Sequence, residues 1–149
     1  MIEQPSINRG TGIALIVGIL SAVYAATFFF GALLHLGGRV PLGFAVLDEP
    51  GILPATIVES LCGSALAVAA FAVLARKGWA WTAATTAHAF ALGGVLLGIA
   101  ALAVGAGPST ELNTIYHRVM LITLTAVLAV LLSPSGRTAL RGPRRERAE

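Results

Sequence analysis

The chain has few charged residues and little cysteine. Only 11% of its 149 residues are charged, whereas charged residues make up about a quarter of an ordinary soluble domain. A single cysteine, Cys62, excludes a disulfide or a multi-thiolate metal cluster within one chain. Hydrophobic residues reach 56% of the total. This composition is typical of a chain embedded in a membrane and leaves no segment for a soluble catalytic domain.

Four long apolar stretches, separated by three short breaks, fill most of the sequence. They cover residues 12–35, 54–75, 81–105 and 115–132. Each reaches or approaches the roughly 20 residues that a helix needs to cross the hydrocarbon core. We therefore predict an all-α, integral membrane four-helix bundle over residues 1–135. A basic tail over residues 136–149, rich in Arg, Gly and Pro, is predicted to be disordered.

A short internal similarity relates the second and fourth stretches. Residues 56–59 read TIVE and residues 114–117 read TIYH, and apolar sequence follows both. Two repeated helical hairpins related by an axis along the membrane normal would produce this pattern.

Most of the positive charge lies on one side of the predicted membrane. Eight of the ten Lys and Arg residues fall there: Arg9, Arg76, Lys77, Arg137, Arg141, Arg144, Arg145 and Arg147. The other side holds Arg39, with Arg118 just inside the fourth stretch. Because short basic loops stay in the cytoplasm, we predict a multi-pass protein of the inner (plasma) membrane with both termini cytoplasmic.

The expected partners follow from the same pattern. The basic residues lie at the ends of the stretches, so no folded surface for nucleic acid is expected and the lipid bilayer is the main partner. Small residues recur at four-residue spacing, as in Gly94 and Gly98 or Ser60 and Ser64. Such stripes favour close helix contacts within one bundle, in a homodimer or in a larger membrane complex.

Ionisable and polar side chains gather in the half of the bundle away from the basic side. Buried polar groups at membrane depth are costly and usually face the bundle interior. The residues concerned are His35, Glu59, Glu111, Asn113, His117 and Arg118. Asn113 and His117 share one helix face because they are four residues apart. We predict a ligand-binding site formed by His35, Glu59, Asn113 and His117, with Glu111 and Arg118 tuning its charge.

Two imidazoles and a carboxylate are also a possible metal-ligand set. His35, Glu59 and His117 would suit Zn²⁺, Fe²⁺ or Mn²⁺, so a divalent metal cofactor is one hypothesis. Glu111 or the acidic pair at residues 48–49 could add ligands. No short-range motif such as HExxH supports this hypothesis. In the alternative, His35 is interfacial, Glu59 pairs with Arg118, and His117 bonds a backbone carbonyl.

His88 lies apart from this group. Its place near the basic end of the third stretch puts it too far across the bilayer to join the other two histidines. A bis-histidine haem site would need a second imidazole at similar depth, so we interpret His88 as a hydrogen-bonded interior residue.

Three segments carry a resemblance to known proteins. Residues 31–37 (GALLHLG), the Glu59 stretch and residues 111–118 (ELNTIYHR) together resemble a family of small four-span bacterial membrane proteins to which no activity is assigned. The resemblance implies that these polar positions belong together. The four-span layout is also similar to small multidrug transporters, but those carry an essential carboxylate in the first span, and residues 12–35 contain no acid.

Two classes of function remain open from the sequence. The polar site could serve a membrane enzyme or carrier that handles a lipid-soluble molecule. Alternatively, the chain is a non-catalytic accessory subunit of a larger membrane complex.

Overall fold

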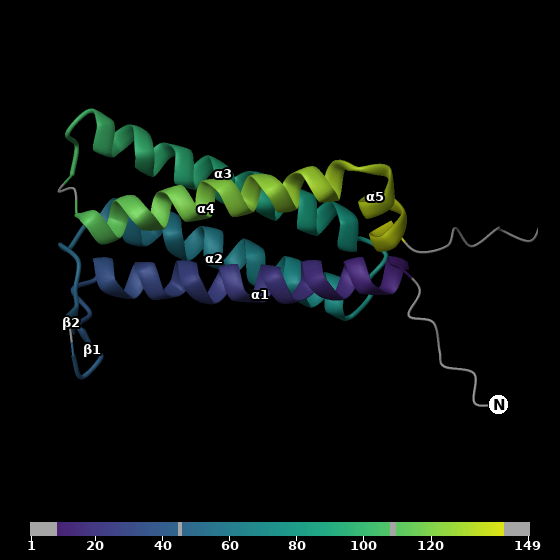
Figure 1. The fold of residues 1–149 in the computed structure, drawn as a ribbon, viewed down its shortest axis with the longest axis horizontal. Helices are drawn as coiled ribbons and strands as arrows, with labels where there is room; N and C mark the ends of the chain where they lie inside the picture. Colours follow the sequence, from purple (N-terminus) through teal and green to yellow (C-terminus); the bar gives the residue numbers. More distant parts are fainter. Residues whose placement is uncertain (1–8, 45, 108–109, 142–149) are drawn as a thin grey trace, which may run out of the picture.

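The predicted all-α architecture is confirmed. The computed structural model describes residues 9–44, 46–107 and 110–141. Its elements are α1 (Arg9–His35), β1 (Val40–Pro41), β2 (Val46–Leu47), α2 (Leu53–Leu74), α3 (Ala80–Ala103), α4 (Glu111–Leu132) and α5 (Pro134–Arg141). The four long helices run along the longest axis of the molecule (Figure 1). The antiparallel pair β1–β2 lies at one end, called here the hairpin end, and α5 lies at the other, called the α5 end.

Four helices have the dimensions and the surface of membrane spans. Each of α1 to α4 is 22 to 27 residues long, which at about 1.5 Å per residue covers a hydrocarbon core about 30 Å thick. Their outward faces are also apolar: Ile16 is 60% exposed and Ile122 is 68% exposed. These features indicate a polytopic membrane protein, since lipid rather than water suits such a surface.

Neighbouring helices pack in chain order, α1 on α2, α2 on α3 and α3 on α4. Small residues make this close approach possible, as predicted. A Cβ added to Gly94 of α3 would lie 2.8 Å from Cys62 Sγ of α2, and a Cβ added to Gly63 of α2 would lie 3.2 Å from the Ala25 carbonyl oxygen of α1. A larger residue at either position would require neighbouring atoms of the facing helix to shift. The repeat of two helical hairpins and the homodimer stay predictions.

Helix α4 begins at Glu111, four residues before the apolar stretch that starts at residue 115. Thr110 explains the difference because its Oγ1 accepts a 3.0 Å hydrogen bond from the Asn113 amide, as an N-cap does.

The prediction of a disordered tail from residue 136 is wrong for its first six residues, because α5 extends through Arg141. Ser133 caps this helix by accepting a 3.1 Å hydrogen bond from the Gly136 amide, and Leu140 is buried against the bundle. Two adjacent apolar residues, Ala139 and Leu140, among polar ones carry too weak a pattern to predict a helix. Residues 142–149 lie outside the described part of the chain.

Candidate ligand-binding cavity

A cavity of about 280 Å³ lies near the hairpin end of the bundle. All four long helices contribute to it, α1 through its last residue, together with the segments before α2 and after α3. Its polar side chains are His35, Glu59, Asn113 and His117, and the remainder of the lining is apolar or glycine. The structure therefore brings the four residues of the predicted ligand-binding site to one place.

His35 ends α1 and holds the following loop in position. Its Nδ1 lies 3.2 Å from the Pro50 carbonyl oxygen, and its own carbonyl accepts a 3.0 Å hydrogen bond from the Ile52 amide. Because a carbonyl oxygen can only accept, Nδ1 carries the hydrogen. In the neutral ring, Nε2 is then an acceptor with a free lone pair. The His35 side chain is buried and lines the cavity, whose other walls are mainly apolar.

His117 has the same tautomer for the same reason. Its Nδ1 donates to the Asn113 carbonyl oxygen, one turn earlier on α4, at 2.8 Å. This bond confirms the alternative interpretation of His117, and the residue lines the cavity as well. Its Nε2 packs against Gly98 of α3, where an added Cβ would overlap the ring. Gly98 therefore makes room for the imidazole.

Glu59 is buried without a strong partner for its carboxyl group. Its side chain packs against Gly31 of α1, where an added Cβ would lie 2.7 Å from Glu59 Oε1. Within the described residues, Glu59 Oε2 makes no hydrogen bond. The alternative interpretation, in which Glu59 forms an ion pair with Arg118, is wrong because the described residues contain no such ion pair. An unpartnered buried carboxyl costs roughly 1–3 kcal/mol, and more when it is charged.

Tyr116 of α4 belongs to this group, although it was not among the predicted site residues. Its hydroxyl lies within interaction range of the Glu59 carboxyl but without the alignment of a regular hydrogen bond, and it has no other partner among the described residues. Its ring meets Phe28 edge-on at 6.2 Å and His117 edge-on at 5.4 Å between centroids. The signals in the sequence were its position directly before His117 and its place in the polar segment ELNTIYHR.

Glu111 and Arg118 were predicted to tune the site, and the structure places them elsewhere. Both side chains are exposed, and neither lines the cavity. The helix period explains this: residues seven apart share a face, so Glu111 and Arg118 lie together on the outer surface of α4. Asn113 and His117, four residues apart, share the face that lines the cavity.

The metal hypothesis finds no support in the arrangement of the side chains. In residues 9–44, 46–107 and 110–141, no group of three or more His, Cys, Asp and Glu side chains could hold a metal ion. His117 Nε2 packs on Gly98 of α3, whereas the Glu59 carboxyl packs on Gly31 of α1. Asp48 pairs instead with Arg39 at 3.4 Å. Glu49 accepts a 2.7 Å hydrogen bond from the Thr110 hydroxyl.

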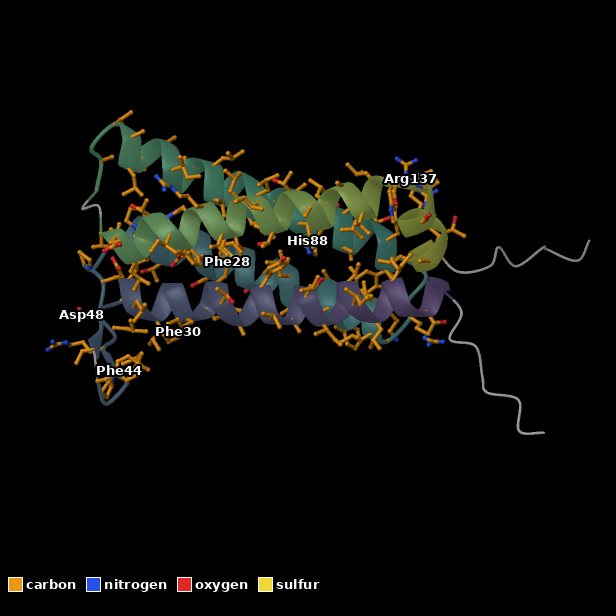
Figure 2. All side chains as sticks on the ribbon, in the orientation of Figure 1. Phe28, Phe30, Phe44, Asp48, His88 and Arg137 are labelled. Atoms are coloured by element: carbon orange, nitrogen blue, oxygen red, sulfur yellow. The ribbon has the colours of Figure 1, made fainter. Side chains whose placement is uncertain are left out.

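His88 is a hydrogen-bonded interior residue, as predicted. Its Nδ1 donates to the Ala84 carbonyl oxygen at 2.8 Å, and the ring meets Tyr24 edge-on with 5.9 Å between centroids. Figure 2 shows it inside the bundle, between Asp48 at the hairpin end and Arg137 at the α5 end. It does not line the cavity.

No protein family model, curated protein or solved structure matches this chain.

Proposed function

We propose that this protein is a multi-pass plasma-membrane protein whose cavity, at the extracytoplasmic side, binds a small and mostly apolar molecule carrying a hydrogen-bond donor. The observation that carries the proposal is that three acceptors, His35 Nε2, His117 Nε2 and the Glu59 carboxyl, belong to side chains that line one apolar cavity.

The distribution of charge supports the orientation. Arg76, Lys77, Arg137 and Arg141 all lie at the α5 end. At the hairpin end, Arg39 is paired with an acid. The positive-inside rule then assigns the α5 end to the cytoplasm and the hairpin end, with its cavity, to the extracytoplasmic side.

The lining defines the chemistry of the ligand. At about 280 Å³ the cavity is near the lower limit of small-molecule pockets, so the ligand is small. Its walls are mainly Ala, Gly, Leu, Val, Ile and Pro, which suit an apolar body that enters from the lipid. A hydroxyl or amine on that body would satisfy an acceptor that otherwise stays unpaired, and an unpaired polar group in an apolar site is costly.

The proposal can be tested with two probes that differ by one hydroxyl group, 4-fluorobenzyl alcohol and 4-fluorotoluene. Their binding to the full chain in detergent is measured by ¹⁹F NMR, with empty micelles as the reference. We expect the alcohol to bind about tenfold more tightly, because one hydrogen bond in a dry site contributes about 1.4 kcal/mol.

Two variants distinguish binding of the probes in the cavity from non-specific partitioning of the probes into the bundle. Glu59→Leu is expected to remove the preference for the alcohol, and the matched control Glu111→Leu, on the exposed face of α4, is expected to keep it. Equal binding of both probes to the wild-type chain would contradict the proposal. So would an unchanged preference in Glu59→Leu, and either result would favour the accessory-subunit hypothesis.

A further inference from the structure

A second cavity, of about 870 Å³, opens at the α5 end between the start of α1, the turn joining α2 to α3, and α5. We call it the basic groove, because three cationic side chains, Arg76, Lys77 and Arg141, line it. They come from two segments far apart in the sequence, so the fold itself gathers them.

These cations have no acidic partner in the described part of the chain. No Asp or Glu lines the groove, and the ion pair found among the described residues, Arg39–Asp48, lies at the opposite end of the bundle. Three like charges around one hollow repel one another, and an anion between them would remove that repulsion.

The backbone at Arg76 adopts an uncommon conformation. Its φ is +51°, in the left-handed region that glycine favours. The Arg76 amide donates to the Val73 carbonyl oxygen at 3.1 Å and the Lys77 amide to the Ala72 carbonyl oxygen at 2.8 Å, which together form a Schellman motif. An arginine at this position costs about 1 kcal/mol relative to glycine. Local helix capping therefore does not explain why a cation occupies it.

The guanidinium of Arg141 lies over the indole ring of Trp81. The group lies 4.0 Å from the centroid of the Trp81 ring, and the ring is fixed because Trp81 Nε1 donates to the Leu131 carbonyl oxygen at 2.9 Å. Stacking uses the flat face of a guanidinium and leaves its N–H edge free to bind two oxygens of a phosphate.

We infer that the basic groove binds the phosphate group of an anionic phospholipid. Phosphate is the shared chemistry of a lipid headgroup and free inorganic phosphate, and the remaining lining favours the lipid. Ile13, Ala14 and Ala139, which are only partly buried, form an apolar wall next to the cations. Inorganic phosphate makes no favourable contact with an apolar wall, whereas the glycerol and upper acyl chains of a lipid would pack on it. The groove also lies where four membrane-length helices end, at the level of headgroups.

Native mass spectrometry of the full chain, released from detergent micelles, tests this inference. One sample contains dioleoyl phosphatidylglycerol, a second contains dioleoyl phosphatidylcholine, and a third contains phosphatidylglycerol with millimolar inorganic phosphate. We expect the phosphatidylglycerol adduct to exceed the phosphatidylcholine adduct at least about tenfold, since cations near the membrane surface favour an anionic headgroup over a zwitterionic one. Inorganic phosphate is expected not to displace the lipid.

The variants Arg76→Gly and Arg141→Gln remove cations from the groove, and the double variant is expected to lose most of the preference for phosphatidylglycerol. Arg76→Gly also suits the left-handed backbone, so the fold is expected to survive. Lys77→Gln, which retains the Schellman hydrogen bonds, provides a second test of the same charge cluster. The control is Arg39→Gln, which removes one cation at the opposite end.

Three results would overturn the inference. Equal adducts of the two lipids with the wild-type chain would show that the groove does not select anionic headgroups. An unchanged preference in the double variant and in Lys77→Gln would show that these cations do not form the site. Displacement of phosphatidylglycerol by inorganic phosphate would assign the groove to the free anion and remove the lipid.

Discussion

The His117 imidazole of α4 packs directly against Gly98 of α3, so closely that a Cβ at position 98 would overlap Nε2. This contact places the acceptor nitrogen of His117 at the wall of the cavity and leaves no space for a larger residue opposite it.

Gly98→Ala is therefore expected to destabilise the bundle by about 1–3 kcal/mol, the usual cost of overpacking. It is also expected to weaken binding of 4-fluorobenzyl alcohol, because the displaced ring changes the cavity. Thermal unfolding in detergent and ¹⁹F NMR measure the two effects. Gly93→Ala is the matched control, since a Cβ at Gly93 meets nothing within 4 Å. Alanine there is expected to be neutral or slightly stabilising. Equal effects of the two substitutions would contradict the contact.

Glu59→Leu is expected to stabilise the protein while removing selective binding. The carboxyl group is buried and its Oε2 has no partner among the described residues. Replacing it with an apolar side chain of similar size should recover roughly 1–3 kcal/mol. The midpoint of thermal unfolding, compared with that of the wild-type chain, measures this gain. A large loss of stability would instead mean that the carboxyl supports the fold.

Thr110→Val is expected to cost about 1 kcal/mol, because the hydroxyl caps α4. The same hydroxyl donates to the Glu49 carboxylate, so its loss should also loosen the loop that precedes α2. Thr123→Val serves as the control: its exposed hydroxyl donates only to the Val119 carbonyl oxygen one turn earlier. Amide hydrogen exchange of residues 46–52 should rise in the first variant alone. Unchanged exchange there would show that the Thr110–Glu49 bond does not hold the loop.

Single-cysteine labelling tests the proposed orientation. In a Cys62→Ala background, Phe44→Cys places a thiol at the tip of the hairpin, where Phe44 is 90% exposed (Figure 2). Ser135→Cys places one on α5. A maleimide that does not cross membranes, added to intact cells, should label the first and leave the second unlabelled until the cells are opened. The reverse pattern would invert the topology.

The helices could be predicted from the sequence because membrane spans carry a long and redundant signal. Length and hydropathy located all four spans, while the ends depended on single contacts such as the Thr110 cap. Helix α5 was not predicted because it is short and because its stability depends on tertiary packing, such as the burial of Leu140.

The site was predictable in part. The spacing of Asn113 and His117 predicted that they share one helix face. The cost of exposing polar groups to lipid predicted that the buried polar side chains face the interior of the bundle. The same helical spacing places Glu111 and Arg118 on a different face of α4. They were included in the predicted site because they are close to Asn113 and His117 in the sequence. Tyr116 stands in both motifs quoted from the sequence, TIYH and ELNTIYHR, but its proximity to Glu59 depends on how the helices pack and could not be predicted.

The most direct test of the cavity is the position of a bound probe. Nuclear Overhauser effects are measured between the fluorine of 4-fluorobenzyl alcohol and the imidazole protons of the three histidines. We expect enhancements at His35 and His117, which line the cavity, and none at His88, which does not. Enhancement at His88 alone, or at none of the three rings while the alcohol is bound, would contradict a ligand site at the hairpin end.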